Sequence, residues 1–215
     1  MNALLIPVKD PARAKTRLGE LLSADERAAL VWAMFEDLRR AVGQTTLAER
    51  IVLVSSYAPA LAEARALGWE VLIEEAQISE SASVDWASQK LAEQGCDGVL
   101  RLPADVPLIR GADIDELLAV PLIAPAVLLV PSRDGTGTNA ILRTPPDLFP
   151  SHFGPNSLAL HKAEAAGVGA RCALVENERI ALDIDEPSDV TALLARGHGT
   201  QAYNLLTTIQ RRNRE

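Results

Sequence analysis

The segment 99–107, VLRLPADVP, constrains the fold more than any other part of the chain. It is an apolar run that is stopped by Pro103 and Pro107, which is typical of a buried strand that ends in a rigid, extended loop. Asp105 stands at the tip of that strand. Because ligands of open parallel α/β sheets bind outside the carboxyl ends of the strands, Asp105 is placed to hold a metal ion on a phosphate. The alternative is a solvated turn aspartate.

Strands and helices alternate along most of the chain. The apolar runs predict strands at 3–8, 51–55, 69–73, 99–102, 126–130, 140–142, 170–175 and 179–184. Helical spacing and capping residues predict helices at 23–42, 59–67, 113–118, 158–166 and 187–195, and one more that ends at 92. This alternation predicts an α/β domain with a mostly parallel, doubly wound sheet flanked by helices. We expect the domain to span 1–196, and 197–215 to form a partly helical tail.

Composition narrows the class of ligand. The 215 residues are 48% hydrophobic and only 4% aromatic, which suits one core rich in Ala, Leu and Val. The formal net charge of −8, without a dense block of Lys or Arg, argues against a nucleic-acid polymer or an anionic membrane as partner. Cys96 and Cys172 lie far apart and in no metal-ligand spacing, so we expect reduced thiols and a cytoplasmic protein. We therefore expect a small-molecule ligand.

The loop after the first strand is the most cationic part of this acidic chain. Lys9, Arg13, Lys15 and Arg17 fall within nine residues. Because the loop emerges at the carboxyl edge of the sheet, it is suited to cradle a polyphosphate. The alternative is a solvated basic loop.

Three further loops are rich in groups that bind anions. The serine-rich segment 79–83 precedes a helix and offers hydroxyls and backbone N–H groups to a ligand, or simply caps the helix. The Gly-Thr segment 131–139 lets backbone approach a ligand closely, or forms a hairpin without a role. Gly154 and Ser157 lie at the positive end of a further helix, which is a seat for a carboxylate or phosphate. His152 and His161 receive no role.

The sequence Leu182-Asp183-Ile184-Asp185 alternates apolar and acidic residues. In an extended segment, residues two apart point to the same side, so Asp183 and Asp185 present two carboxylates close together. Like charges at that separation are unfavourable unless a cation lies between them. With Asp105 they predict a site for one or two Mg²⁺ ions, whereas the alternative is that Asp183 or Asp185 caps the following helix.

Five separated motifs resemble the guanylyltransferases of coenzyme F-420 biosynthesis, the CofC/FbiD family. In chain order they are the segments 6–18, 102–107, 134–140, 153–157 and 183–187. The resemblance runs from about residue 4 to residue 195. It implies a single-domain nucleotidyltransferase fold of the GT-A, Rossmann-like type, GTP as donor and Mg²⁺ as cofactor. It also implies a small phosphorylated acid as acceptor: 2-phospho-L-lactate, phosphoenolpyruvate or 3-phospho-D-glycerate.

The resemblance also implies roles for particular residues. The expected metal ligands are Asp105, Asp183 and Asp185, and the expected catalytic residues are Lys15, Arg17 and Asp105. Nucleotide binding is expected at Pro7, Lys9, Lys15, Arg17, Ser83, Pro103 and Asp105, and acceptor binding at Thr138, Asn139, Gly154 and Ser157. The chain departs from the family where it has serine-rich residues 79–83 in place of a Gly-Leu-Asn stretch that contacts the base. Its tail after Gly197 is also expected to exceed the family's usual end.

The mechanism that these expectations define is in-line attack of an acceptor phosphate oxygen on the α-phosphorus of GTP, with pyrophosphate as leaving group. A phosphate acceptor is ionised at neutral pH, so the reaction needs no general base. Three rivals stay open at this stage. They are a sugar-phosphate nucleotidyltransferase, a glycosyltransferase that uses the Asp183/Asp185 pair, and a non-catalytic nucleotide sensor whose basic tail recruits a partner.

Overall fold

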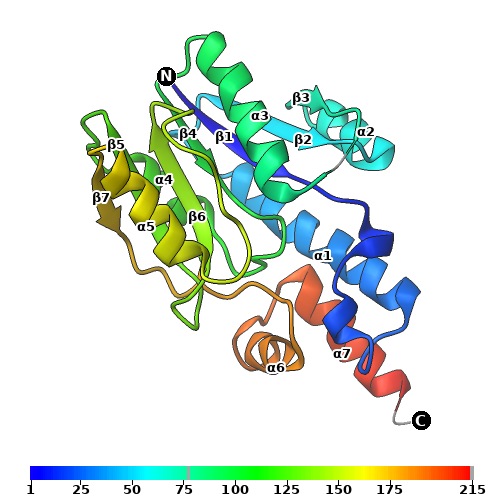
Figure 1. Ribbon diagram of the computed structural model, residues 1–215. Coiled ribbons are helices and arrows are strands. Elements are labelled where there is room, and N and C mark those ends of the chain that lie inside the picture. Colours follow the sequence, from blue (N-terminus) through cyan, green and yellow to red (C-terminus); the bar gives the residue numbers. More distant parts are fainter. Residues whose placement is uncertain (77, 214–215) are drawn as a thin grey trace.

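A mixed β-sheet forms the middle layer of the structure, a computed structural model that describes residues 1–76 and 78–213 (Figure 1). Within these ranges its seven strands lie in the order β3-β2-β1-β4-β6-β5-β7. Their bounds are β1 Asn2–Pro7, β2 Arg50–Ser55, β3 Glu70–Ile73, β4 Gly98–Arg101, β5 Ala126–Pro131, β6 Thr138–Thr144 and β7 Arg171–Leu174. Strand β6 is antiparallel to β4 and β5, and the other pairs are parallel. The predicted mostly parallel α/β sheet is confirmed.

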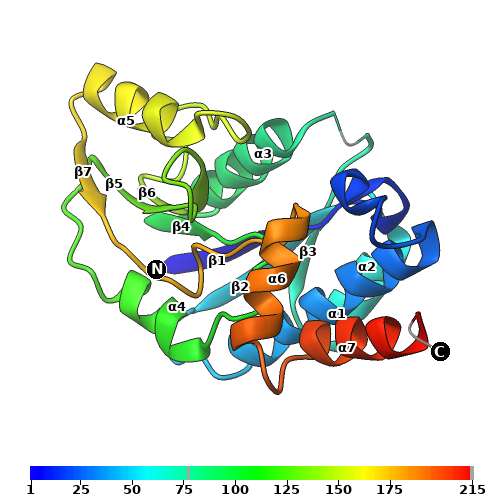
Figure 2. The same cartoon turned by 90° about the horizontal axis from the view of Figure 1, so that it is seen from below.

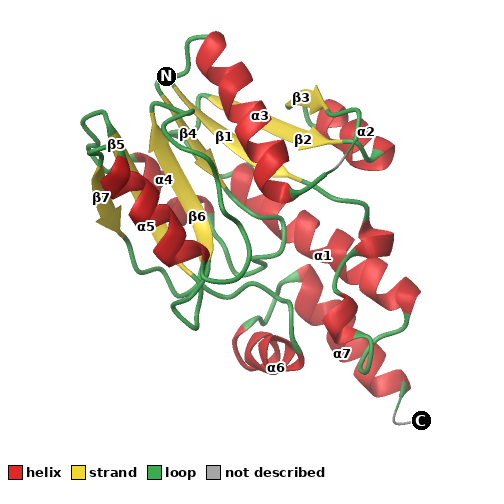
Figure 3. Ribbon diagram, viewed as in Figure 1, coloured by secondary structure: helices red, strands yellow, loops and turns green. Residues whose placement is uncertain are grey.

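Helices cover both faces of this sheet, as Figures 2 and 3 show. One face carries α1 (Ala24–Val42), α2 (Ala58–Ala66) and α4 (Gly111–Leu118). The opposite face carries α3 (Glu80–Glu93) and α5 (Ser157–Gly167). The chain also forms α6 (Pro187–Arg196), α7 (Gln201–Arg212) and two single 3-10 turns after β1, η1 (Pro11–Arg13) and η2 (Thr16–Leu18). None of the described helices is both long enough and apolar enough to cross a bilayer.

The central strands are apolar throughout because both of their sides are covered. In β1, Leu4 and Ile6 pack toward α1, whereas Ala3 and Leu5 pack toward α3. All four side chains are fully buried, and each buried Leu or Ile contributes roughly 1.5–3 kcal/mol to the stability of the fold. Strands buried on both faces therefore appear as unbroken apolar runs in the sequence.

Local capping fixes where α1 begins, and the capping box expected from the sequence is confirmed. The Ser23 hydroxyl accepts a hydrogen bond from the Glu26 N–H at 3.3 Å, and the Glu26 carboxylate accepts one from the Ser23 N–H at 2.8 Å. Two backbone donors that the helix cannot satisfy itself are thereby paired. Helix α1 then runs to Val42.

The C-terminal helix α7 packs along α1. The buried carboxylate of Asp37, on α1, accepts hydrogen bonds from the N–H groups of Gln201 and Ala202 at 2.7 and 3.0 Å. Leu206 and Ile209 are buried in the core that α7 shares with α1. Residues 201–212 are therefore a docked helix.

The strand predicted at 179–184 is absent from the described structure. Residues 178–180 form a turn and residue 181 a bend, and residues 182–184 carry no regular structure, although burial alternates, with Ile180, Leu182 and Ile184 all buried. The backbone of this segment makes isolated hydrogen bonds, such as the one that the Ile184 N–H donates to the Asp105 carbonyl at 3.1 Å. The alternation of burial is therefore real, but it arises from the packing of a loop that begins with a turn and not from a β-ladder.

Candidate active site

A cavity of about 640 Å³ opens at the carboxyl ends of β1 and β4. It brings together most of the residues that the sequence analysis selected. The selected residues that line it are Lys9, Arg17, Pro103, Asp105, Thr138, Asn139, Gly154, Ser157, Asp183 and Asp185. These residues come from five separated loops, and the fold gathers them at one edge of the sheet.

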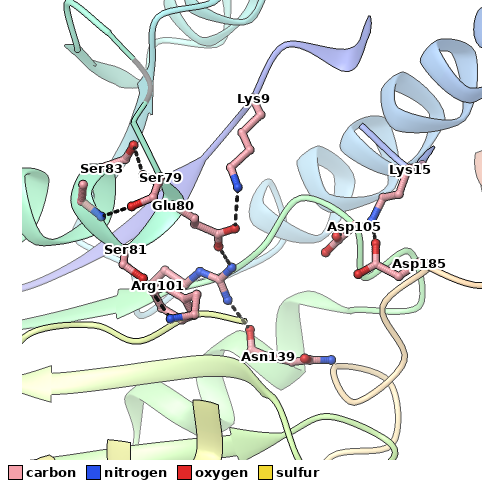
Figure 4. Close-up of polar contacts among 12 residues, drawn as sticks. Lys9, Lys15, Ser79, Glu80, Ser81, Ser83, Arg101, Asp105, Asn139 and Asp185 are labelled. Atoms are coloured by element: carbon pink, nitrogen blue, oxygen red, sulfur yellow. Dashed lines mark hydrogen bonds and ion pairs between the residues drawn. The ribbon is translucent and has the colours of Figure 1, made fainter. Parts of the chain in front are cut away.

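Lys15 joins two of the selected carboxylates, as the close-up in Figure 4 shows. Its ammonium lies 2.6 Å from Asp105 Oδ2 and 2.6 Å from Asp185 Oδ1, and its side chain is only 6% exposed. Burial alone would lower the pKa of Lys15, but the two carboxylates outweigh burial and raise that pKa above its usual value. Lys15 is therefore a fixed cation within the acidic cluster.

Asp183, two residues before Asp185, is the third acid of the cluster formed with Asp105 and Asp185. It accepts a hydrogen bond from Asn139 Nδ2 at 3.0 Å. Burial, reinforced by the carboxylates of Asp105 and Asp185, raises the pKa of Asp183 to about 6. Asp183 therefore lies close enough to Asp105 and Asp185 for the three carboxylates to repel one another.

The acid cluster offers carboxylate oxygens as ligands for a divalent cation. Asp105 Oδ1 is buried and has no hydrogen-bond partner among the described residues. The described residues contain no group of three or more His, Cys, Asp or Glu side chains already arranged around one point. An unpaired carboxylate oxygen beside two further acids is nevertheless a ligand set of the kind that Mg²⁺ or Mn²⁺ prefers, so the residues fit a divalent cation.

The opposite wall is built on the start of α5. Ser157 Oγ accepts a hydrogen bond from the Thr138 N–H at 2.8 Å. The Thr138 hydroxyl lies 3.0 Å from Nδ1 of the fully buried His161, whose Nε2 accepts the His152 N–H at 2.8 Å. Burial, together with the nearby Arg143 guanidinium, lowers the pKa of His161 to about 4. The imidazole is therefore neutral at pH 7 and orients Thr138.

Glycine is required at two positions of this wall. A Cβ on Gly137 would lie 2.7 Å from Ser132 Oγ, the atom that accepts the Gly137 N–H. Gly154 has a φ of +126°, which side-chain-bearing residues rarely adopt. Both loops therefore depend on the glycines that the sequence analysis noted.

Some selected residues lie elsewhere. Ser83 is buried, and its hydroxyl donates to Glu74 and to the Ser79 carbonyl instead of lining the cavity. Ser79 caps α3 by accepting the Ala82 N–H, which was the alternative for this segment. Pro7 is a buried residue at the end of β1. The side chain of Arg13 lies outside the described structure.

Sequence reasoning assigned no role to Arg101, although it belongs to the segment on which that reasoning began. The Arg101 side chain lines the cavity, is 6% exposed and forms an ion pair with Glu80 on α3. Its NH1 donates to the Asn139 carbonyl at 2.9 Å, and its Cζ lies 4.1 Å from the centre of the Phe153 ring. Burial lowers the pKa of Arg101 to about 10, which leaves it charged. The sequence feature that could have indicated a role for Arg101 is an arginine within an otherwise apolar strand.

The fold is shared with a solved structure of a nucleotidyl transferase. The structure resembles a nucleotidyl transferase from Methanothermobacter thermautotrophicus, with a TM-score of 0.64 and 16% identity over 92% of this chain and 97% of that one. It also resembles Rv0371c from Mycobacterium tuberculosis H37Rv in complex with manganese, with a TM-score of 0.51 and 18% identity over 91% and 98% of the two chains. At these identities the likeness establishes the fold.

The family follows from sequence comparison. The model of the family described as "Guanylyl transferase CofC like" matches residues 2–212, and the chain belongs to that family. A phosphoenolpyruvate guanylyltransferase of Rubrobacter xylanophilus is 37% identical over 193 residues, which is 90% of this chain and 93% of that protein. A 3-phospho-D-glycerate guanylyltransferase of Colwellia psychrerythraea is 31% identical over 94% and 96% of the two chains. A 2-phospho-L-lactate guanylyltransferase of M. thermautotrophicus is 30% identical over 96% and 90%.

The comparisons confirm the family resemblance drawn from the five motifs, and they favour a guanylyltransferase over the three rivals. They also correct one expectation. Because the family model extends to residue 212, helix α7 lies within the span of the family and not beyond its usual end.

Proposed function

We propose that this protein transfers GMP from GTP to a small phosphorylated three-carbon acid, in the biosynthesis of coenzyme F-420. The candidate acceptors are the phosphoenolpyruvate, 3-phospho-D-glycerate and 2-phospho-L-lactate named for its relatives. The observation that carries the proposal is that Asp105, Asp183 and Asp185 line one cavity, where Lys15 pairs with Asp105 and Asp185 and both of these acids raise the pKa of Asp183. Both substrates are small molecules, and the protein acts in the cytoplasm, without a nucleic-acid polymer or a membrane and upstream of another transferase.

Asp105, Asp183 and Asp185 are the residues that would hold Mg²⁺, as one or two ions. The unpaired Asp105 Oδ1 and the raised pKa of Asp183 support this assignment, because both reflect negative charge that a cation would neutralise. The manganese complex of the structural relative Rv0371c agrees with it. A bound divalent cation supplies charge neutralisation at the phosphates and a template that aligns them.

The remaining groups position the reactants. Lys9 and Arg17, which line the cavity, neutralise the triphosphate together with Lys15 of the acid cluster. The loop at Pro103 shapes the seat of the triphosphate, and the buried Pro7 supports it from the end of β1. Thr138, Asn139, Gly154 and Ser157 hold the acceptor, and Ser83 supports the nucleotide site indirectly by fixing the start of α3.

The proposed reaction is a single displacement. An acceptor phosphate oxygen forms a bond to the α-phosphorus of GTP as the bond to the α,β-bridging oxygen breaks, and pyrophosphate leaves with that electron pair. The attacking oxygen is already ionised at neutral pH, so no side chain removes a proton. This agrees with His161, whose imidazole is buried behind Thr138 and has both nitrogens engaged.

The test is incubation of the protein with GTP, Mg²⁺ and each of the three acids in turn. We expect one acid to yield pyrophosphate and a product heavier by one guanylyl group, detected by mass. Absence of that product with all three acids, from a folded protein, would reject the proposed function.

A further inference from the structure

Arg101 carries a positive charge at a buried position, where a charge costs free energy. It is the last residue of β4, between β1 and β6, and its guanidinium lies on the sheet face that α3 and α5 cover. A buried charge is tolerated only when it is paired and hydrogen-bonded. The contacts of Arg101 show how its charge is stabilised at this position.

Those contacts hold the guanidinium but leave it unsaturated. A guanidinium has five N–H donors. Within the described residues NH1 donates to the Asn139 carbonyl, NH2 donates to Glu80, and Nε has no partner. The Phe153 ring packs against the guanidinium plane at 4.1 Å. Arg101 is thus fixed in orientation and retains donor capacity, and its side chain lines the cavity.

The charges around Arg101 make one end of the cavity positive. Glu80 is shared, because its other carboxylate oxygen accepts from Lys9 Nζ at 3.3 Å (Figure 4). Two cations and one carboxylate leave this Lys9–Glu80–Arg101 cluster with a formal charge of +1. At the other end, three carboxylates and Lys15 leave −2. An incoming anion is therefore attracted to the first cluster, and a cation to the second.

Asn139 joins the two clusters within one residue. Its carbonyl accepts from Arg101, and its side-chain amide donates to Asp183 at 3.0 Å. The two clusters are therefore separated by about the size of one amino acid. A ligand that serves both must carry two anionic groups on a short skeleton, with its phosphate at the divalent cation that the acid cluster would hold and its second anion beside Arg101.

We propose that Arg101, oriented by Glu80 and Phe153, is the subsite that binds the carboxylate of the acceptor. The proposal rests on the proposed function, since it assumes that the acceptor phosphate reacts at the acid cluster. It adds a determinant of specificity, because a phosphorylated three-carbon alcohol carries the phosphate but offers Arg101 no anion. A charge-assisted hydrogen bond is worth roughly twice a neutral one, so the loss of this contact is measurable.

The experiment measures the dissociation constants of two ligands by calorimetry, in the presence of Mg²⁺ and a non-hydrolysable GTP analogue. One ligand is the phosphorylated acid that the wild-type protein guanylylates, or each of the three acids if none reacts. The other is glycerol 3-phosphate, which lacks a carboxylate. We expect the wild type to prefer the acid, and Arg101→Gln to weaken acid binding about 30- to 100-fold while glycerol 3-phosphate binding changes less than about threefold.

Arg143→Gln, studied at a temperature at which this variant is folded, is the matched control, because Arg143 is a buried arginine on the same sheet face that does not line the cavity. It should leave the acid-to-alcohol ratio of the dissociation constants unchanged. If Arg101→Gln does not fold, Arg101→Lys retains the charge without the fork geometry and should weaken acid binding about tenfold and alcohol binding hardly at all.

Two results would overturn the proposal: equal weakening of acid and alcohol binding by the Arg101 variants, or a wild type that binds both ligands equally. Its failure is distinguishable from failure of the proposed function. A wild type that guanylylates an acid, but whose acid preference survives Arg101→Gln, rejects only the carboxylate subsite. A wild type that forms no product rejects the proposed function.

Discussion

Two buried arginines, Arg101 and Arg143, occupy equivalent settings on one face of the sheet. Each projects from a strand and pairs with an acid on α3, Glu80 for Arg101 and Asp85 for Arg143. Each also lies against a phenylalanine from the segment before α5, with Cζ at 4.1 Å from the Phe153 ring and 5.9 Å from the Phe149 ring. They differ in how completely their donors are used.

Arg143 uses more of its donors within the protein than Arg101 does. Its NH1 donates to Asp85 at 3.0 Å and to the Phe149 carbonyl at 2.5 Å, and its NH2 donates to Ser88 at 2.9 Å. Arg101 makes fewer contacts and lines the cavity. Two residues of the same type, burial and pairing can therefore have different roles, and the unused donors distinguish a binding residue from a structural one.

The largest expected effect tests the structural arginine. Arg143→Gln removes the partner of Asp85 and leaves Ser88 and the Phe149 carbonyl without their donor, so the free energy of unfolding should fall by about 3–5 kcal/mol. Chemical denaturation would measure the change. A loss of unfolding free energy below about 1 kcal/mol would mean that Arg143 does not have the structural role assigned to it.

The next effect concerns His161, whose ring contacts both phenylalanines. Its pKa of about 4 lies below the ordinary histidine value of 6.5, so the unfolded chain takes up the proton first, and stability is lost as the pH falls from about 6.5 to 4. In His161→Gln this loss is absent. The stability advantage of the wild type over this variant should therefore shrink by about 3 kcal/mol between pH 7 and pH 4.

Denaturation at several pH values, in parallel on both proteins, provides the measurement. Parallel curves for the two proteins would show that His161 is protonated in the folded state as readily as in the unfolded one. The buried contacts of His161 with Thr138 and the two phenylalanines would then be incorrect.

The smallest effect tests the packing of Phe153 against Arg101. Phe153→Leu removes the aromatic face from the guanidinium, which is worth roughly 0.5–1 kcal/mol, so acid binding should weaken about two- to fivefold. Glycerol 3-phosphate binding should not change. Phe149→Leu is the control, and acid binding that weakens equally in this variant would erase the difference between the two arginines.

Much of this molecule is predictable because its signals are local. Two examples are the capping box of Ser23 and Glu26 and the unbroken apolar run of β1. In both, a few adjacent residues are enough to predict the local structure. The acid pair at 183 and 185 was also found, since alternation alone places both residues on one side of an extended segment. The topology of parallel strands then brings Asp105 to the same edge.

The parts that were missed depend on partners far away in the chain. The segment 179–184 alternates like a strand, but no neighbouring strand is available to it in the described sheet. Arg101 and Glu80 are 21 residues apart, and His161 reaches Thr138 across 23 residues. Nothing local to these residues indicates the pairing, which forms only when α3 and α5 pack on the sheet.

Guanylyl transfer at the acid cluster is the claim on which the comparison of the two arginines depends, and Asp105→Asn tests it most directly. The variant should keep the wild-type melting temperature within a few degrees but form guanylylated acid, measured by mass from GTP, Mg²⁺ and the acceptor, at least about 100-fold more slowly. A folded variant that forms the product at a rate near that of the wild type would contradict the account.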